Sequence, residues 1–195
     1  MKVAIALLAG FIVGTLSGLI FGYSHWRNPD LVEYPEVRAH FLENLIRQTG
    51  PVDTLVLGDS IVESTDLSDV CGKTFNAGVG SSMADTASHL AMIALPLLKP
   101  KTVVVNVGRN SISRGYSLKQ MEAGYLRLVH QLRGYRLILV GIPESPAGTA
   151  FIKRTAAQIG AAFVEPVPPD LTFEGIHPTP QGAKLLRLRI AAACR

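Results

Sequence analysis

Residues 54–60 read Thr-Leu-Val-Leu-Gly-Asp-Ser, an apolar run that ends on a glycine, an aspartate and a serine. Residues 103–108 (VVVNVG) and 137–143 (LILVGIP) show a similar pattern, an apolar run that leads into glycine or proline. All three runs are apolar on successive residues, which is typical of strands that are buried on both faces of a sheet. We therefore expect a parallel sheet that is covered by helices on both sides.

Outward from these runs, short β-rich segments alternate with segments whose apolar residues recur at helical spacing. The predicted strands are 54–57, a segment around Phe75, 102–107, 136–142 and 162–164. The predicted helices are 36–48, 82–98, 118–132, 148–159 and 180–194. Such alternation is typical of an α/β fold, so the sequence predicts a three-layer α/β/α sandwich with a parallel sheet.

The residues that directly follow the strands are the first candidates for a functional site. In an open α/β sheet, ligands bind beyond the carboxyl ends of the strands. Four polar or glycine-rich ends fit this description: Gly58-Asp59-Ser60, Asn76-Ala77-Gly78, Gly108-Arg109-Asn110 and Pro143-Glu144-Ser145. We expect these ends to converge on one edge of the sheet.

The composition of the 195 residues excludes several other classes of protein. Hydrophobic residues make up 48% of the chain and there are two cysteines, which rules out a disordered chain and a disulfide-dense miniprotein. Lysine and arginine outnumber the acidic residues by 19 − 15 = 4, but they are scattered along the chain. We therefore expect no nucleic-acid partner. No cysteine–histidine spacing indicates a metal site.

The N-terminal residues form an uncharged run of membrane-spanning length. Residues 3–22 carry no charge, and a helix of 20 residues is about 30 Å long, close to the thickness of a bilayer core. A cleaved signal peptide is the rival interpretation, because Gly22-Tyr23-Ser24 is a weak cleavage pattern, although the apolar region of a signal peptide is usually shorter. The sequence thus predicts an anchor or signal sequence at 1–23, a polar linker at 24–35 and the main domain at 36–195.

The same segment bears on partners and location. Four glycines share one helix face, which would let two such helices pack closely as a homodimer: Gly10, Gly14, Gly18 and Gly22. We expect the main domain outside the cytoplasm, anchored to the membrane, or secreted if the leader is cleaved. Cys71 and Cys194 either pair there or remain as two thiols, and the sequence leaves both states open.

Ser60 and His177 are the candidates for nucleophilic catalysis. Ser60 directly follows a predicted strand, so its N–H would lie at the start of the next helix, although Asp59 or Ser60 could equally be a plain helix cap. His177 precedes the last predicted helix, and Glu174 lies three residues before it. A carboxylate in that place can orient the imidazole and stabilise its charged form.

Gly78 and Asn110 could supply donors for an oxyanion. Acyl transfer develops negative charge on the carbonyl oxygen, and preorganised N–H groups stabilise that charge. Gly78 offers a backbone N–H without a side chain to obstruct a substrate, and Asn110 offers an amide. Taken separately, each of the two is equally at home in a turn.

Together these blocks resemble the SGNH (GDSL-like) hydrolase family. The blocks are Gly58-Asp59-Ser60, Gly78 within NAGVG, Gly108-x-Asn110 and Glu174-x-x-His177, in the family's order over about residues 52–193. The resemblance implies a flavodoxin-like fold, with Ser60 as nucleophile, His177 as base and Asp59 in support. It also implies an oxyanion hole made by the N–H groups of Ser60 and Gly78 and the side chain of Asn110, in an SGNH-type hydrolase domain.

Two positions depart from the family's pattern. The family has aspartate three residues before the histidine, where Glu174 is one methylene longer, so Asp170 could take its place or the site could act as a dyad. The family's third block commonly continues with aspartate, where this chain has Ser111.

The resemblance implies a serine esterase that needs no cofactor. We expect it to hydrolyse short-chain acyl esters, O-acetyl esters foremost, with cell-envelope carbohydrates as the substrates suggested by the predicted location. Two alternatives remain at this point. The same residues could transfer the acyl group to an envelope glycan, or the fold could serve as a non-catalytic envelope binding or assembly module.

Overall fold

The computed structural model describes residues 30–195, with side chains from residue 34 onward. Residues 35–195 form one compact unit. Within residues 30–195, no helix combines the length and the apolar character needed to cross a bilayer. The predicted membrane segment 3–22, including its glycine face, lies outside the described residues.

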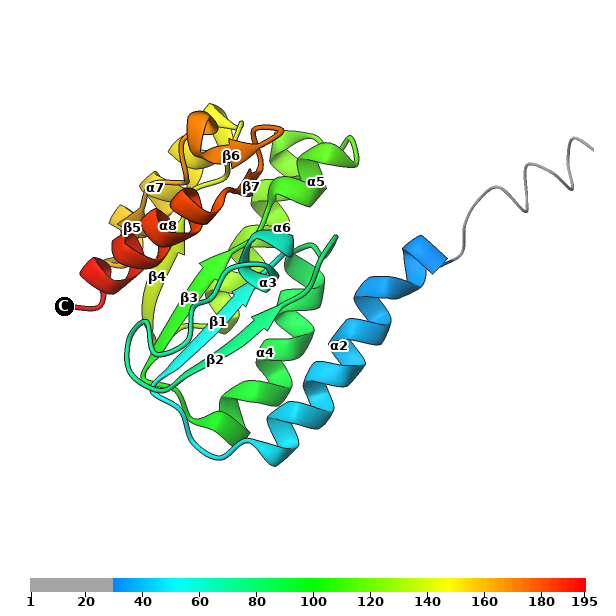
Figure 1. The fold of residues 1–195 in the computed structure, drawn as a ribbon, viewed down its shortest axis with the longest axis vertical. Helices are drawn as coiled ribbons and strands as arrows, with labels where there is room; N and C mark the ends of the chain where they lie inside the picture. The colour runs from blue at the N-terminus through cyan, green and yellow to red at the C-terminus, as the bar shows by residue number, and fades with distance from the viewer. Residues whose placement is uncertain (1–29) are drawn as a thin grey trace, which may run out of the picture. The chain divides into compact units, whose positions relative to one another are not determined.

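The centre of the compact unit is a five-stranded parallel sheet (Figure 1). Its strands are β1 (Thr54–Gly58), β2 (Thr74–Gly78), β3 (Thr102–Asn106), β4 (Arg136–Val140) and β5 (Ala162–Val164). They lie in the order β2-β1-β3-β4-β5, and every neighbouring pair is parallel. This is the flavodoxin-like order. The predicted α/β fold with a parallel sheet is therefore confirmed.

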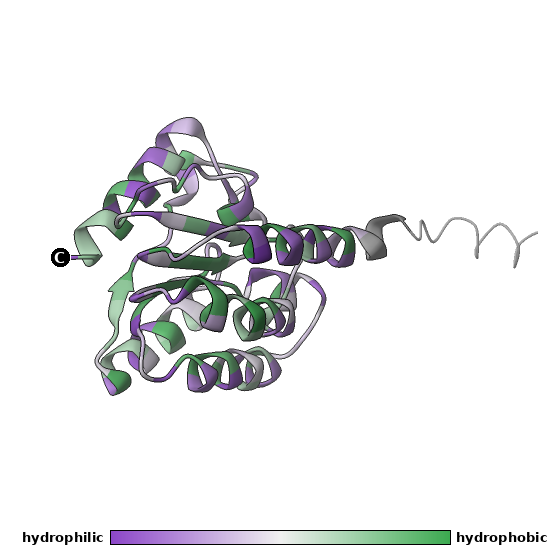
Figure 2. Ribbon diagram, turned by 90° about the horizontal axis from the view of Figure 1, so that it is seen from below, coloured by the Kyte–Doolittle hydropathy of each residue, from purple (hydrophilic) through white to green (hydrophobic). Residues whose placement is uncertain are grey.

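Helices cover both faces of the sheet because successive strand residues point to opposite sides. Leu55 and Leu57 of β1 pack into one core, whereas Val56 between them packs into the other. The first core receives α2 (Asp30–Gln48), α4 (Ala84–Leu98), α6 (Leu118–Gln131) and α7 (Pro146–Ile159). The second receives α3 (Ser60–Glu63) and α8 (Pro180–Ala193). The strands appear as an apolar layer between helices in Figure 2.

Some boundaries differ from the prediction. Helix α2 begins at Asp30 rather than at residue 36 and continues through Pro35, although proline removes one N–H donor from the helix. A proline is usually found in the first turn of a helix, so Pro35 made the predicted start of this helix too late. Helix α7 begins at Pro146 rather than at residue 148, with Ser145 as its cap.

Cys71 and Cys194 form a disulfide, so of the two states that the sequence leaves open the structure has the bridged one. Their Cα atoms are 5.9 Å apart. The bond joins the segment that leads into β2 to the carboxyl end of α8.

Candidate active site

Ser60 lies where β1 ends and α3 begins, at the carboxyl edge of the sheet. Asp59 is the N-cap of α3, and its Oδ1 accepts from the N–H of Ile61 at 3.0 Å. With this cap in place, Ser60 is the first residue of the helix. The Ser60 hydroxyl is 2.9 Å from Nε2 of His177. The structure thus brings together two residues that lie 117 positions apart in the chain.

His177 is carried by a short antiparallel hairpin that the sequence analysis did not predict. Strand β6 (Thr172–Phe173) pairs with β7 (His177–Pro178), and the N–H of Ile176 donates to the carbonyl of Phe173. Between them, Glu174 has φ +43° and Gly175 has φ +78°. Because Phe173 pairs with His177, three residues form the loop of the hairpin, and positive φ values are typical of such short loops. This turn aims the Glu174 side chain back at His177.

Nδ1 of His177 lies 2.5 Å from Oε1 of Glu174. The hydrogen-bond partners assign the tautomer: Nδ1–H donates to the carboxylate, so Nε2 can accept from the Ser60 hydroxyl. Asp170 lies instead in the 3₁₀ turn Pro169–Leu171, and the described residues show no contact between it and the ring. Glu174 therefore occupies the position from which a carboxylate orients the imidazole.

Asn110 lies in the short helix α5 (Arg109–Ser113), which follows β3 at the same edge. Its Nδ2 donates to the carbonyl of Ser82 at 2.8 Å. Because a side-chain amide has two N–H groups, this bond fixes the direction of the amide and leaves the second N–H for another acceptor. The hydroxyl of Ser82 donates in turn to the carbonyl of Gly58, so Asn110 is tied to the end of β1.

The predicted role of Gly78 in the oxyanion hole disagrees with the structure. The Gly78 N–H donates to Oδ1 of Asn76 at 2.9 Å, so it is already used within the chain. The position needs glycine for another reason, because a Cβ there would lie 2.3 Å from the backbone N of Glu63. Gly78 permits α3 to pack against the end of β2.

The loop that follows β2 also lies at the site, although its sequence did not point to a functional role. Ser81 in this loop has φ +59°, an uncommon value for a residue with a side chain, and its carbonyl accepts from Nη2 of Arg114 at 2.9 Å. No residue type in NAGVGSS signals that conformation. The loop is nevertheless placed beside the site by the two hydrogen bonds of Ser82.

An ion pair lies behind the turn that carries Glu174. Nη2 of Arg109 is 3.2 Å from Oε2 of Glu144, a residue with φ +54° that follows β4. Glu144 approaches the turn so closely that a Cβ on Gly175 would lie 1.8 Å from its Oε1. The strand end Pro143-Glu144-Ser145 therefore lies at the site, as expected. Its Glu144 packs against the turn at Gly175.

The carboxyl of Asp59, next to Ser60, has a strongly shifted pKa. Burial raises the pKa of its carboxyl to about 6, while the hydrogen bond from Ile61 and the attraction of His177 and Arg109 lower it. The side chain is 1% exposed. At neutral pH most of this carboxyl is therefore ionised.

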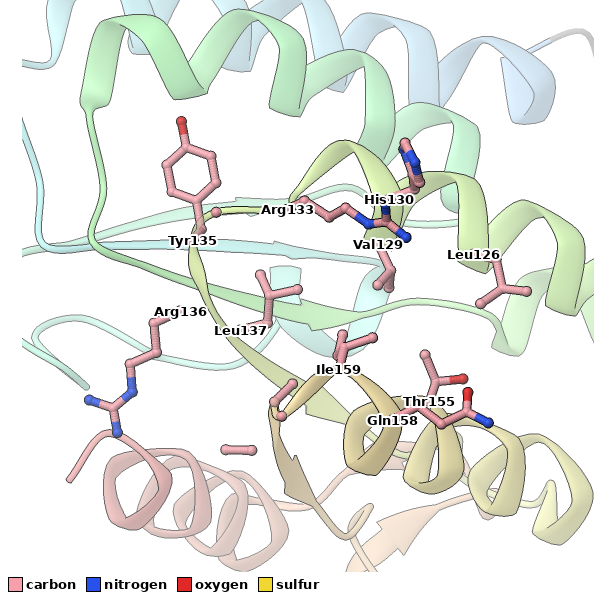
Figure 3. A pocket seen from close by; sticks show the side chains of 14 residues that line it. Leu126, Val129, His130, Arg133, Tyr135, Arg136, Leu137, Thr155, Gln158 and Ile159 are labelled. Atoms are coloured by element: carbon pink, nitrogen blue, oxygen red, sulfur yellow. The ribbon is translucent and has the colours of Figure 1, made fainter.

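A large pocket lies at the other edge of the sheet (Figure 3). It has a volume of about 890 Å³, and its lining includes His130, Arg133, Arg136 and Ile159. Arg136 is the first residue of β4, so the pocket opens at the amino ends of the strands. Neither Ser60 nor the hairpin of His177 lines it. Within residues 30–195, no group of three or more His, Cys, Asp and Glu side chains is arranged to hold a metal ion.

The structural neighbours of the chain are GDSL-like lipases, esterases and acylhydrolases. The esterase EstA from Pseudoalteromonas sp. has a TM-score of 0.59 at 18% identity, over 72% of this chain and 94% of that one. A GDSL-like lipase from Bacteroides thetaiotaomicron has a TM-score of 0.60 at 18% identity, over 72% and 86%. The lipase/acylhydrolase from Enterococcus faecalis has a TM-score of 0.59 at 18% identity, over 71% and 93%.

These likenesses establish the fold that the chain shares with such enzymes. No family model matches the sequence, and no curated protein matches it. The resemblance indicated by the four sequence blocks is thus confirmed at the level of fold.

Proposed function

We propose that the protein is a serine esterase in which Ser60 is the nucleophile, His177 the general base and Glu174 the orienting acid. The observation that carries this proposal is the continuous chain of contacts from the Ser60 hydroxyl through both ring nitrogens of His177 to Glu174. In such a chain the base lies within hydrogen-bond reach of the nucleophile, and a third group fixes its tautomer.

The reaction follows from these contacts. Ser60 Oγ attacks the ester carbonyl carbon while Nε2 of His177 takes the hydroxyl proton. The resulting imidazolium is stabilised by Glu174 and by the buried carboxylate of Asp59. His177 then gives the proton to the leaving alcohol, which leaves an acyl group on Ser60. A water molecule, deprotonated by the same imidazole, releases the acid.

The oxyanion of the tetrahedral intermediate has two donors in this proposal. The Ser60 N–H is the first of α3 and has no acceptor within the helix. The second N–H of Asn110 is the other donor, because Ser82 uses only one. The Gly78 N–H has no part in it, since Asn76 accepts its hydrogen.

Short acyl esters on envelope carbohydrates are the substrates that we propose. The reacting groups are open to solvent, with the side chains of His177 and Glu174 exposed by 41% and 57%, so an ester on a bulky carrier can reach Ser60. The disulfide of Cys71 and Cys194 favours an oxidising compartment. The uncharged residues 3–22 favour a membrane-anchored domain outside the cytoplasm.

A phosphonate probe tests the assignment of the nucleophile. The structure of EstA is of a form inhibited by monoethylphosphonate. We expect a fluorophosphonate to label this chain at Ser60, and both labelling and hydrolysis of p-nitrophenyl acetate to disappear in Ser60→Ala and His177→Ala. The exposed residues Ser68 and His130 supply the controls, since Ser68→Ala and His130→Ala should retain both.

An adduct on a different serine, or neither adduct nor turnover, would refute the proposal. A p-nitrophenyl series of increasing acyl length then tests the preference for short chains. Transfer of acetate to an added glycan in preference to water would mean that the same residues act as an acyltransferase.

A further inference from the structure

Exposed apolar side chains lie on three of the segments at the edge of the sheet that holds the candidate active site. Phe173 is 56% exposed and is the direct partner of His177 in the β6–β7 hairpin. Directly opposed residues of an antiparallel pair project to the same face, with Cβ atoms about 4.5–5.5 Å apart. The side chain of Phe173 therefore projects to the same face of the hairpin as the imidazole, with more than half of its surface open to solvent.

Two other segments add to this rim. Tyr116, which is 44% exposed, lies in the connection from α5 to α6, and Leu118, which is 38% exposed, is the first residue of α6. That connection is held at the catalytic edge by the bond from Arg114 to Ser81. Val37 of α2 is 64% exposed. Its neighbour Arg38 pairs with Glu63 of α3 at 3.0 Å, so this part of α2 also lies at the catalytic edge.

The polypeptide enters the compact unit at the same edge. Within the compact unit, α2 runs from Pro35 to Gln48 and ends shortly before β1 in the chain, and Arg38 near its start lies 3.0 Å from Glu63 of α3. The Pro35 end of this segment therefore lies toward the carboxyl ends of the strands. The uncharged run ends at Gly22, eight residues before α2. Even a fully extended connection of that length spans only about 28 Å. An anchor at residues 3–22 would therefore be joined to the compact unit at its catalytic edge.

We propose that this rim docks on the surface of the bilayer and that the substrate is an ester presented at that surface. Four side chains of this rim contact the lipid: Phe173, Tyr116, Leu118 and Val37. Moving exposed aromatic and aliphatic side chains from water into the bilayer interface lowers the free energy. The docking follows from the rim and from the place where the chain enters. The identity of the substrate as an ester rests on the proposed function.

The docking is tested on the full chain in nanodiscs of phosphatidylcholine and phosphatidylglycerol. Because Cys71 and Cys194 are bonded to each other, one introduced cysteine can carry an environment-sensitive fluorophore. Phe173→Cys and Val37→Cys report on the rim. Leu188→Cys and Met92→Cys are matched controls, because these side chains are 57% and 60% exposed on α8 and α4.

We expect a blue-shifted emission, quenched by lipid-borne quenchers, at 173 and 37 and not at 188 and 92. Equal behaviour of all four probes overturns the docking. Emission at 173 that is insensitive to lipid quenchers but changes with protein concentration also overturns it, because the rim then contacts a second copy. A chain isolated from membranes without residues 1–22 overturns the tether.

Measurements of activity test the role of the rim independently of the fluorescent probes. The ratio of turnover on a vesicle-borne ester to turnover on soluble p-nitrophenyl acetate should fall about five-fold in Phe173→Ser and stay constant in Leu188→Ser. A constant ratio in both variants contradicts a role of the rim in substrate access. Lipid-sensitive probes on a chain that hydrolyses neither ester would refute the esterase function and leave the docking standing.

Discussion

Replacing the buried carboxyl of Asp59 by an amide should make the protein more stable at neutral pH. In Asp59→Asn the cap is kept, because the amide oxygen can accept from the Ile61 N–H as Oδ1 does now. What the variant loses is a charge held in a site that is 1% exposed. Burial is the main reason why the pKa of this carboxyl rises from 3.8 to about 6.

The sign follows from proton linkage. Between the two pKa values the folded state holds a proton on Asp59 that the unfolded state has released, so the wild type loses stability as the pH rises through this window. From about pH 4.5 to about pH 7.5 the loss from this group is about 2 kcal/mol. The variant lacks the group, so its stability relative to the wild type should increase by that amount.

Urea unfolding of residues 24–195 at both pH values measures the effect. Any loss in the free energy of unfolding that does not depend on pH is the same at both pH values. It cancels when the difference between variant and wild type is compared at the two values, which leaves the titration of Asp59. Asp66→Asn is the matched control: Asp66 is exposed, and hydrogen bonds from Ser68 lower the pKa of its carboxyl, so removing it should produce no such gain. A difference between Asp59→Asn and wild type that does not change with pH would refute the reasoning. Hydrolysis by Asp59→Asn should be slower, because the imidazolium of His177 loses a stabilising charge.

Three further predictions concern the site and the disulfide. The loss of kcat/KM for p-nitrophenyl acetate should be at least ten times smaller in Glu174→Ala than in His177→Ala, because the carboxylate orients the ring whereas the imidazole transfers the proton. Equal losses in the two variants would mean that the carboxylate has a larger role. Asn110→Ala should lower kcat by about 10²–10³ with little change in KM, as expected for a donor to the oxyanion; steady-state kinetics that show a change in KM alone would contradict this. Cys194→Ser opens a bridge between residues 123 positions apart and should lower the free energy of unfolding by about 5 kcal/mol on the chain-entropy account; an unchanged urea midpoint would speak against it.

The sheet could be predicted because its signal is local and repeated. The runs of β1, β3 and β4 are apolar on successive residues and end on residues typical of turns, so each of these strands is identified from its own few residues. Strand β2 (Thr-Phe-Asn-Ala-Gly) lacks such a run, so the sequence indicated it only as a segment around Phe75. The functional edge then follows from the rule for parallel sheets. Ser60 and Asn110 lie at the ends of β1 and β3, on either side of the point where the strand order reverses.

The error at Gly78 has a physical cause. A glycine at a strand end offers a free N–H only if no nearby side chain accepts from it, and Asn76 accepts from it two residues away. Asparagine commonly bonds to the backbone two residues on, so the pattern Asn-x-Gly held the signal. The ion pair of Arg109 with Glu144 had no such signal, because its partners lie 35 residues apart and meet through the fold alone.

The turn at Glu174 could not be predicted from the sequence either. Positive φ is costly for a glutamate, so nothing in Phe-Glu-Gly-Ile predicts a hairpin except the glycine. Only the packing of Glu144 beneath Gly175 and the contact of Glu174 with His177 explain why the chain adopts it.

The bond between Cys71 and Cys194 also constrains the order of events during biosynthesis. Cys71 must wait for 123 further residues to be made before its partner exists. By then β1 to β5 have all been synthesised. Oxidation is therefore a late step, and it fastens the carboxyl end of α8, the helix that follows His177, to the segment that leads into β2.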